Sequence, residues 1–266
     1  MDEYYNPSEN HAEDLSDLAT NSTYRTLNIL KALAYHKEAT LEELAPFVDL
    51  SRPTLFRFLV VLQRMGYVAK NKDNRYSLTP MLFAIASRSI EDVELNRIAK
   101  PFLEDMCFDT GETSLLGILN DDAVLYLTKV ESKYNVRFHE RLGKMTPLYC
   151  TALGKVLLAG MSDEELYDYL AKEKLIPYTN HTIVDPIKLK EHIKLTRERG
   201  YSEVLSEYEQ DIHALGCPVF DHDGKVIAAV SINWPLFRET PDKFETCLAR
   251  LKSVARTISI LMGYNE

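Results

Sequence analysis

The sequence of 266 residues lacks the patterns that mark several large classes of protein. No apolar run reaches the roughly 18 residues that a membrane-spanning helix needs, which argues against an integral membrane role. The four cysteines form no CxxC pair, so the sequence favours buried free thiols over a zinc ribbon or a disulfide scaffold. The first residues lack the basic and apolar pattern of a secretory signal, and we expect a cytoplasmic protein.

Motifs of the common enzyme classes are also missing. The sequence holds no G-x-S-x-G nucleophile motif, no phosphate-binding P-loop and no G-x-G-x-x-G. It has only ten glycines, and they do not cluster around a phosphate-sized loop. We therefore expect a protein that is not an enzyme and that holds no cofactor and no metal.

The charge of the chain is unevenly distributed around its net value of −9. Residues 1–20 carry six acids and no lysine or arginine, residues 21–80 carry nine bases against five acids, and the remainder is acidic. A small basic module beside a larger acidic one is a common layout for a DNA-binding domain joined to a sensor. Chance clustering could give the same distribution, so the order of the predicted elements has to show whether the basic module is a DNA-binding domain.

A helix, helix, turn, helix and hairpin are predicted in that order between residues 22 and 82. The first helix has its apolar face at Leu27, Leu30, Leu33 and Ala34, and the third has it at Leu55, Phe58, Leu59 and Leu62. Thr40 and Glu43 form a capping box before the short second helix. Ser51 is placed to cap the third helix, and Gly66 to end it. Two β-like runs around residues 71–74 complete the order of a winged helix-turn-helix.

The third helix is the candidate for insertion into the major groove of DNA. At about 100° per residue, Arg57 lies on the face opposite Leu55. Arginine suits guanine and phosphate, whereas threonine and phenylalanine suit thymine methyl groups. The predicted DNA-binding residues are Thr40, Leu41, Ser51, Arg52, Pro53, Thr54, Phe56, Arg57, Lys70, Lys72 and Arg75. A three-helix bundle with a solvated basic face is the alternative interpretation.

Strands and helices alternate in mixed order after residue 95, which predicts an α+β domain. The expected strands are 113–119, 123–130, 218–220 and 226–234, and the expected helices are 95–106, 151–159, 163–172, 187–199 and 244–262. Ser162 is placed to cap one helix and Gly200 to end another. The segment His222-Asp-Gly224 between two strands predicts a hairpin.

Several segments together resemble one family. The N-terminal ones are Leu44-Ala-Pro, Leu50-Ser-Arg-Pro-Thr-Leu-Phe-Arg-Phe-Leu, Leu62-Gln-Arg-Met-Gly-Tyr-Val and Arg75-Tyr-Ser-Leu. The C-terminal ones are Thr110-Gly-Glu-Thr113, Leu125-Tyr-Leu-Thr-Lys-Val-Glu131, Pro147-Leu-Tyr-Cys-Thr-Ala-Leu-Gly-Lys155, Arg197-Glu-Arg-Gly-Tyr201 and Pro218-Val-Phe-Asp221. In this order they are similar to the IclR family of bacterial regulators. Four further segments resemble the branch of 2-keto-3-deoxygluconate repressors within that family: Glu131-Ser-Lys-Tyr-Asn-Val-Arg137, Gly143-Lys-Met-Thr-Pro-Leu-Tyr149, Lys155-Val-Leu-Leu-Ala159 and Ile258–Tyr264.

The resemblance implies an α+β protein with a winged helix-turn-helix, a linker helix and a GAF-like mixed α/β effector-binding domain. The corresponding boundaries are an acidic mobile tail over 1–21, the DNA-binding domain over 22–82, the linker over 83–96 and the effector-binding domain over 97–266. It also implies a homodimer, or a dimer of dimers, on a palindromic operator in double-stranded DNA, which suits the two-fold symmetry of a dimer.

The resemblance further implies a pocket for a small carboxylate or sugar acid. Its residues are Phe138, Thr146, Thr151, Ala152, Leu153, Gly154, Glu207, Ile212, His213, Ala214, Ser231 and Asn233. The free amides at a helix N-terminus after Thr151 suit a carboxylate. A tight turn with a hydroxyl cap is the alternative for Thr151, and satisfied sheet residues are the alternative for Ser231 and Asn233.

One segment, Glu207-Tyr-Glu-Gln-Asp-Ile-His-Ala214, departs from the family pattern Glu-x-Glu-x-Gly-x-Arg-Cys. Asp211, His213 and Ala214 stand in place of Gly, Arg and Cys, which puts the pocket chemistry in doubt. The acids Glu203, Glu207, Glu209 and Asp211 together with His213 also contain the ingredients of a divalent-metal site, although a solvated acidic edge is favoured.

The expected function is therefore a DNA-binding transcriptional regulator. The branch resemblance implies a repressor of sugar-acid catabolism genes that a small carboxylate effector releases from its operator. An effector-independent DNA-binding protein, or an activator with an altered pocket, is the alternative.

Overall fold

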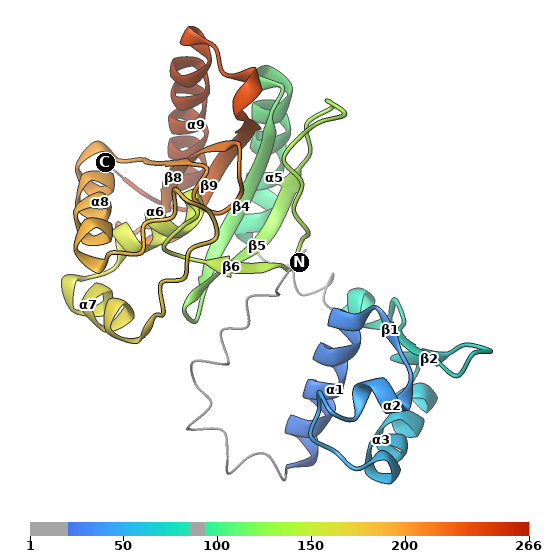
Figure 1. Cartoon of the computed structure of the whole chain (residues 1–266). Coiled ribbons are helices and arrows are strands. Elements are labelled where there is room, and N and C mark those ends of the chain that lie inside the picture. The colour runs from blue at the N-terminus through green and yellow to red at the C-terminus, as the bar shows by residue number, and fades with distance from the viewer. Residues whose placement is uncertain (1–20, 86–93, 266) are drawn as a thin grey trace. The chain divides into compact units, whose positions relative to one another are not determined.

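The computed structural model describes residues 21–85 and 94–265, which divide into two compact units. The acidic tail and most of the linker predicted over 83–96 lie outside these residues. The N-terminal unit consists of α1 (Ser22–His36), β1 (Glu38–Ala39), α2 (Leu41–Leu44), α3 (Arg52–Arg64), β2 (Val68–Lys70) and β3 (Tyr76–Leu78), followed by a helical stretch over 81–85. Its antiparallel sheet has the strand order β1-β3-β2. This confirms the winged helix-turn-helix (Figure 1).

Local signals in this unit act largely as predicted. Thr40 and Glu43 form the reciprocal capping box of α2, and Gly66 follows α3 with a φ of +80°. The buried leucines of α3 are Leu55, Leu59 and Leu62. The face of α1 differs from the prediction, because Ile29 and Leu33 are its buried residues while Leu27 and Ala34 are exposed. Which side of α1 is covered depends on how α2 and the sheet pack against it.

The C-terminal unit is built around a six-stranded antiparallel sheet. Its elements are α5 (Glu94–Thr110), β4 (Thr113–Asn120), β5 (Ala123–Val130), β6 (Met145–Pro147), α6 (Ala152–Gly160), α7 (Asp163–Lys172), α8 (Pro186–Arg199), β7 (Ser202–Leu205), β8 (Ile212–Phe220), β9 (Val226–Pro235), the 3₁₀ turn η3 (Leu236–Arg238) and α9 (Pro241–Leu261). The strand order is β6-β5-β4-β9-β8-β7. The predicted strand 218–220 is the end of the longer β8, and the short strands β6 and β7 were not predicted.

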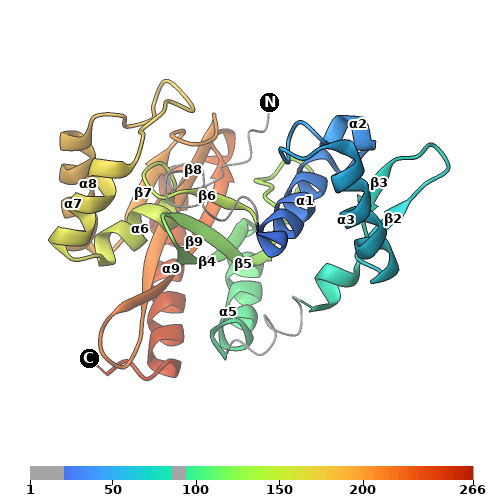
Figure 2. The ribbon, with the colours of Figure 1, turned by 90° about the horizontal axis from the view of Figure 1, so that it is seen from below.

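Helices cover both faces of this sheet. Helices α5 and α9 pack side by side on one face, over a core that includes Leu103, Trp234 and Leu251 (Figure 1). Helices α6, α7 and α8 cover the other face, over a second core that includes Leu153 and Ile193 (Figure 2). Because side chains alternate along a strand, neighbouring residues of β8 and β9 enter different cores. This alternation decides which residues reach the candidate site.

Candidate functional site

Helix α3 presents an exposed face opposite its buried leucines. Arg52, Phe56 and Arg57 are exposed, and Phe56 keeps 48% of its surface accessible. Arg52 lies 3.8 Å from a carboxylate oxygen of Glu42. Arg57 has no ion pair within the described part of the chain, so its guanidinium is available for a base or a phosphate. An unoccupied arginine beside an exposed aromatic ring suits a helix that enters the major groove.

The first turn of α3 contains a contact between two side-chain hydroxyl groups. Ser51 is the N-cap residue by position, but its side chain makes no hydrogen bond to the helix backbone. Its hydroxyl oxygen lies instead 2.9 Å from the Thr54 hydroxyl oxygen. Pro53 occupies the first turn, where a backbone N–H is not required. The two hydroxyls pair with each other at the exposed end of the helix.

The hairpin of β2 and β3 holds its three bases in different ways. Lys72 is exposed in the turn, and the Lys70 ammonium lies 5.2 Å from the centroid of the Tyr76 ring. The Arg75 guanidinium contacts Glu38 at 3.2 Å and Glu43 at 2.9 Å. Arg75 is thus paired with two carboxylates of its own domain, whereas the sequence predicted that it contacts DNA.

Two further residues predicted to bind DNA have structural partners. The Thr40 hydroxyl accepts a hydrogen bond from the Glu43 amide, and the Glu43 carboxylate accepts one from the Thr40 amide. Leu41 is half-buried against the core of the N-terminal unit. Thr40 and Leu41 therefore contribute to the fold, and which residues of the predicted set contact DNA stays a prediction.

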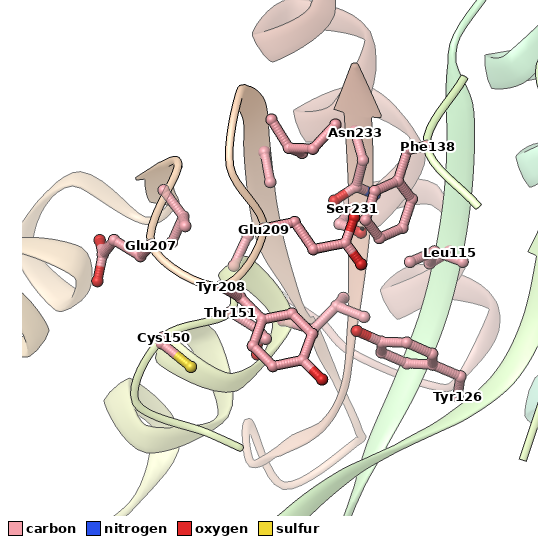
Figure 3. A pocket seen from close by; sticks show the side chains of 15 residues that line it. Leu115, Tyr126, Phe138, Cys150, Thr151, Glu207, Tyr208, Glu209, Ser231 and Asn233 are labelled. Carbon is pink, nitrogen blue, oxygen red and sulfur yellow. Dashed lines mark hydrogen bonds between the residues drawn. The ribbon is translucent and has the colours of Figure 1, made fainter. Parts of the chain in front are cut away.

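A cavity opens in the C-terminal unit between the sheet and the N-terminus of α6 (Figure 3). The lining residues that the sequence predicted are Phe138, Thr151, Ala152, Leu153, Glu207, Ile212, Ala214, Ser231 and Asn233. The others are Leu115, Tyr126, Cys150, Val204, Tyr208 and Glu209. The wall thus combines apolar side chains with hydroxyl, amide and carboxylate groups.

Strand register explains most of this lining. Ser231 pairs with Leu115 and Asn233 pairs with Ala214 across the neighbouring strands, so all four lie on one face of the sheet. The Asn233 amide donates to the Ser231 hydroxyl over 2.9 Å. Leu115 could have been found by the same alternation, if the pairing of β4 with β9 had been known.

Thr151 closes the N-terminus of α6 at the cavity. Its hydroxyl accepts a hydrogen bond from the Gly154 amide over 3.1 Å and donates one to the Pro147 carbonyl over 2.9 Å. The hydroxyl is therefore a helix cap, which was the alternative interpretation. The amides of Ala152 and Leu153 belong to the first turn, where no intrahelical acceptor exists, so they remain suited to an anion.

Three residues predicted for the pocket lie outside its lining. The buried Thr146 donates to the Tyr126 hydroxyl over 3.2 Å and so supports the wall from behind. Gly154 packs against the Leu148 backbone, which an added Cβ would approach to within 2.3 Å. His213 points to the other face of the sheet, because it neighbours the cavity residue Ala214 on β8.

Carboxylates and their partners shape the electrostatics of the cavity. Figure 3 shows the Glu209 carboxylate pointing toward Tyr126 and Ser231, whereas the Glu207 carboxylate points away from them. Glu207 instead accepts a hydrogen bond from the fully buried ammonium of Lys155. Burial raises the pKa of Glu207 above its ordinary value, and this effect outweighs the attraction of Lys155.

Cys150 and Tyr126 of the wall stay neutral. Burial raises the pKa of the Cys150 thiol well above its ordinary value, and the charge of Glu207 raises it further. Burial likewise raises the pKa of Tyr126, so its hydroxyl group keeps its proton. Neither group is activated as a nucleophile or a base.

The acidic segment does not form the metal site considered from the sequence. Residues 206–211 form a turn, so the alternation of a strand does not align their side chains. His213 is held between Glu203 and Glu239. Within the described residues, the one group with metal-ligand geometry is the exposed hairpin Asp221, His222 and Asp223. Exposed acidic turns commonly have this geometry without an ion.

The winged helix-turn-helix together with a separate domain that encloses a cavity with apolar and polar walls defines a DNA-binding transcriptional regulator. Two family models match: "IclR helix-turn-helix domain" over residues 22–72 and "Bacterial transcriptional regulator IclR C-terminal" over residues 87–260. The chain belongs to the IclR family. The relatives it matches are transcriptional regulators and not enzymes. No helix in the described ranges has the length and hydropathy of a membrane span.

Individual relatives cover nearly the whole chain. The HTH-type transcriptional regulator KdgR of Dickeya chrysanthemi is 36% identical, with 93% of this chain and 82% of that protein covered. KdgR of Escherichia coli is also 36% identical, with 93% and 95% covered. The crystal structure of the Thermotoga maritima IclR aligns with a TM-score of 0.75 and 33% identity, covering 92% of this chain and 99% of the other.

Proposed function

We propose that this regulator is a repressor of sugar-acid catabolism genes and that a small carboxylate of the 2-keto-3-deoxygluconate or uronate type releases it from its operator. The observation that carries the proposal is the make-up of the cavity. The first-turn amides of Ala152 and Leu153 suit the carboxylate. Ser231 and Asn233 suit hydroxyl groups on the rest of the ligand, and so does the carboxylate of Glu209, which accepts hydrogen bonds.

The identity to two KdgR regulators supports the same ligand class. Of the three departures from the family pattern, Ala214 is the one that lines the cavity. Asp211 lies in the exposed turn, and His213 faces away. Thr151, Ser231 and Asn233 still give the wall polar groups beside Ala214, which favours an effector-responsive regulator over an effector-independent one.

The operator is proposed to be a palindrome bound by a homodimer, or by a dimer of dimers, with one α3 helix in each half-site. The effector acts by binding differently to the DNA-competent and DNA-incompetent arrangements. A coupling of about 1–3 kcal/mol would change the operator affinity roughly 5–150-fold.

A gel shift tests both parts of this proposal. The full chain is titrated onto the DNA upstream of its own gene, and 2-keto-3-deoxygluconate and related sugar acids are then added. We expect specific binding that one acid releases. Binding that every acid leaves unchanged would favour the effector-independent alternative, and the absence of specific binding would contradict a self-regulating repressor.

Matched variants separate the two sites. Arg57→Ala is expected to abolish specific binding, whereas Arg64→Ala, at the exposed end of the same helix, should retain it. Thr151→Val removes the helix cap and should lose the response to the acid while DNA binding persists. Thr151→Ser keeps the hydroxyl and should respond normally. A normal response of Thr151→Val would place the effector elsewhere.

A further inference from the structure

A buried histidine lies between two carboxylates behind the cavity wall. Nδ1 of His213 is 2.9 Å from a carboxylate oxygen of Glu239, and its Nε2 is 3.2 Å from one of Glu203. Its ring lies 4.5 Å from that of Trp234 and 6.0 Å from that of Phe244, between centroids. Only 5% of the residue is exposed. Both ring nitrogens are thus engaged inside the fold, while the side chains of Glu203 and Glu239 stay about one-third accessible to water.

This geometry requires a doubly protonated ring. A neutral imidazole donates from one nitrogen, and its other nitrogen would turn a lone pair toward a carboxylate. Burial by itself lowers the pKa of His213, but its hydrogen bonds to Glu203 and Glu239 outweigh burial, and the pKa lies above its ordinary value. The hydrogen bond between His213 and Glu203 is also the main reason that the pKa of Glu203 is lowered.

The groups on α8 do not replace the charge of His213. A guanidinium nitrogen of Arg199 lies 3.6 Å from one carboxylate oxygen of Glu203, whereas His213 contacts the other oxygen. Burial lowers the pKa of His192 to about 4, so that ring is neutral near pH 7. Loss of the proton from His213 would therefore leave Glu239 without a cationic partner in this cluster.

The other groups that surround the His213 ring are either uncharged or paired with a different carboxylate. The Trp234 indole donates to the same Glu239 oxygen over 2.7 Å. On α9 the ring is faced by the apolar Phe244, and the adjacent Lys243 donates to the buried Glu112. The imidazolium is the cation that joins Glu203 to Glu239.

The contact of His213 with Glu203 joins the two strands that carry one side of the cavity, and its contact with Glu239 reaches the segment between η3 and α9. His213 stands between the lining residues Ile212 and Ala214 on β8, and Glu203 precedes the lining residue Val204 on β7. We propose that His213 in its protonated form is a positioning residue, which holds β7 and β8 in the register that forms this wall of the cavity. The proposal concerns the order of the wall itself and does not depend on the identity of any effector.

The direction of the pH dependence follows from the raised pKa. The stabilisation by His213 is complete below the pKa of an unfolded histidine, about 6.5, and is lost as pH rises through the folded pKa. The strands β7 and β8 should therefore be well ordered in mildly acidic solution and become less ordered in alkaline solution. An arginine at this position would keep its charge throughout.

Hydrogen exchange on the full chain tests this proposal without DNA or effector. Protection factors, which are corrected for the intrinsic effect of pH, are compared between about pH 6, below the ordinary pKa of histidine, and about pH 9. We expect the amides of 202–214 to lose protection by at least about fivefold in the wild type, the lower end of a typical coupling between sites. The β4–β5 hairpin should change little.

Three variants make the result decisive. His213→Arg should keep the protection of 202–214 at both pH values, and His213→Gln should lose it at both. His192→Gln should behave as the wild type, because that ring does not titrate in this range. Equal pH dependence in the wild type and His213→Arg would overturn the proposal. If His213→Gln does not fold, an NMR titration of the wild type showing His213 at or below its ordinary pKa would overturn it equally.

Discussion

The ammonium of Lys155 on α6 donates a hydrogen bond to the carboxylate of Glu207 in the turn between β7 and β8, and both groups are buried. Burial lowers the pKa of Lys155 and raises that of Glu207, so each group is less easily charged here than in water. The pair ties the turn beside the cavity to the helix whose first amides face it. Removing one partner leaves the other charge buried without compensation.

Glu207→Gln is therefore expected to destabilise the C-terminal unit by about 3–5 kcal/mol. The double variant Lys155→Met, Glu207→Gln should recover most of this loss, because no uncompensated charge remains. Urea unfolding followed by the fluorescence of Trp234, the one tryptophan of the chain, measures the effect in this unit. A loss below about 1 kcal/mol for the single variant would contradict a buried ion pair at this position.

The hairpin of the N-terminal unit should contain one base for DNA and one for the fold. If Lys72 contacts a phosphate, Lys72→Ala lowers the slope of log affinity against log salt by about one unit. Arg75→Ala should instead lower the melting temperature of the unit, because Arg75 links Glu38 and Glu43. Fluorescence anisotropy with operator DNA at several salt concentrations, together with thermal melts, separates the effects. An unchanged slope for Lys72→Ala would remove the hairpin tip from the interface.

Asp211 keeps a backbone conformation that suits glycine. Its φ is +60°, and its amide donates to the Ser206 hydroxyl over 3.1 Å. Asp211→Gly should change the free energy of unfolding by less than about 1 kcal/mol, because the gain in allowed conformation offsets the entropy of glycine. Asp211→Val should cost about 1–3 kcal/mol, because a β-branched residue is strained there. Urea unfolding checks both, and equal stability of the two variants would contradict the strained turn.

The loop after β5 should contribute to acid sensitivity. Hydrogen bonds from Lys129 and then Arg137 lower the pKa of Glu131 to about 2. A lowered carboxylate pKa stabilises the fold above the unfolded pKa, and this contribution is lost as pH falls from about 4.5 toward 2. Glu131→Gln should cost about 1 kcal/mol at neutral pH, since the site is partly exposed. Unfolding measured across this range should show the two proteins converging in acid, and a constant difference would refute the assignment.

Much of the cavity wall could be anticipated from the resemblance, but its orientation could not. Ser231 and Asn233 were placed correctly because a strand alternates whatever it pairs with. His213 and Ala214 were both predicted to face the ligand, although adjacent residues on a strand cannot share a face. Leu115 and Tyr126 were missed because they reach the cavity only through the pairing of β4 with β9 and β5.

The sequence by itself determined the order of the longer elements, the capping boxes at Thr40 and Ser162, and the helix ends at Gly66 and Gly200. It also determined the hairpin turn at His222-Asp-Gly224, because all these signals act within a few residues. Only the tertiary structure decided that Arg75 pairs with Glu38 and Glu43 and that His213 lies between Glu203 and Glu239. These roles depend on partners that the chain brings together from distant positions. Local patterns contain no information on which distant charge or strand will arrive there.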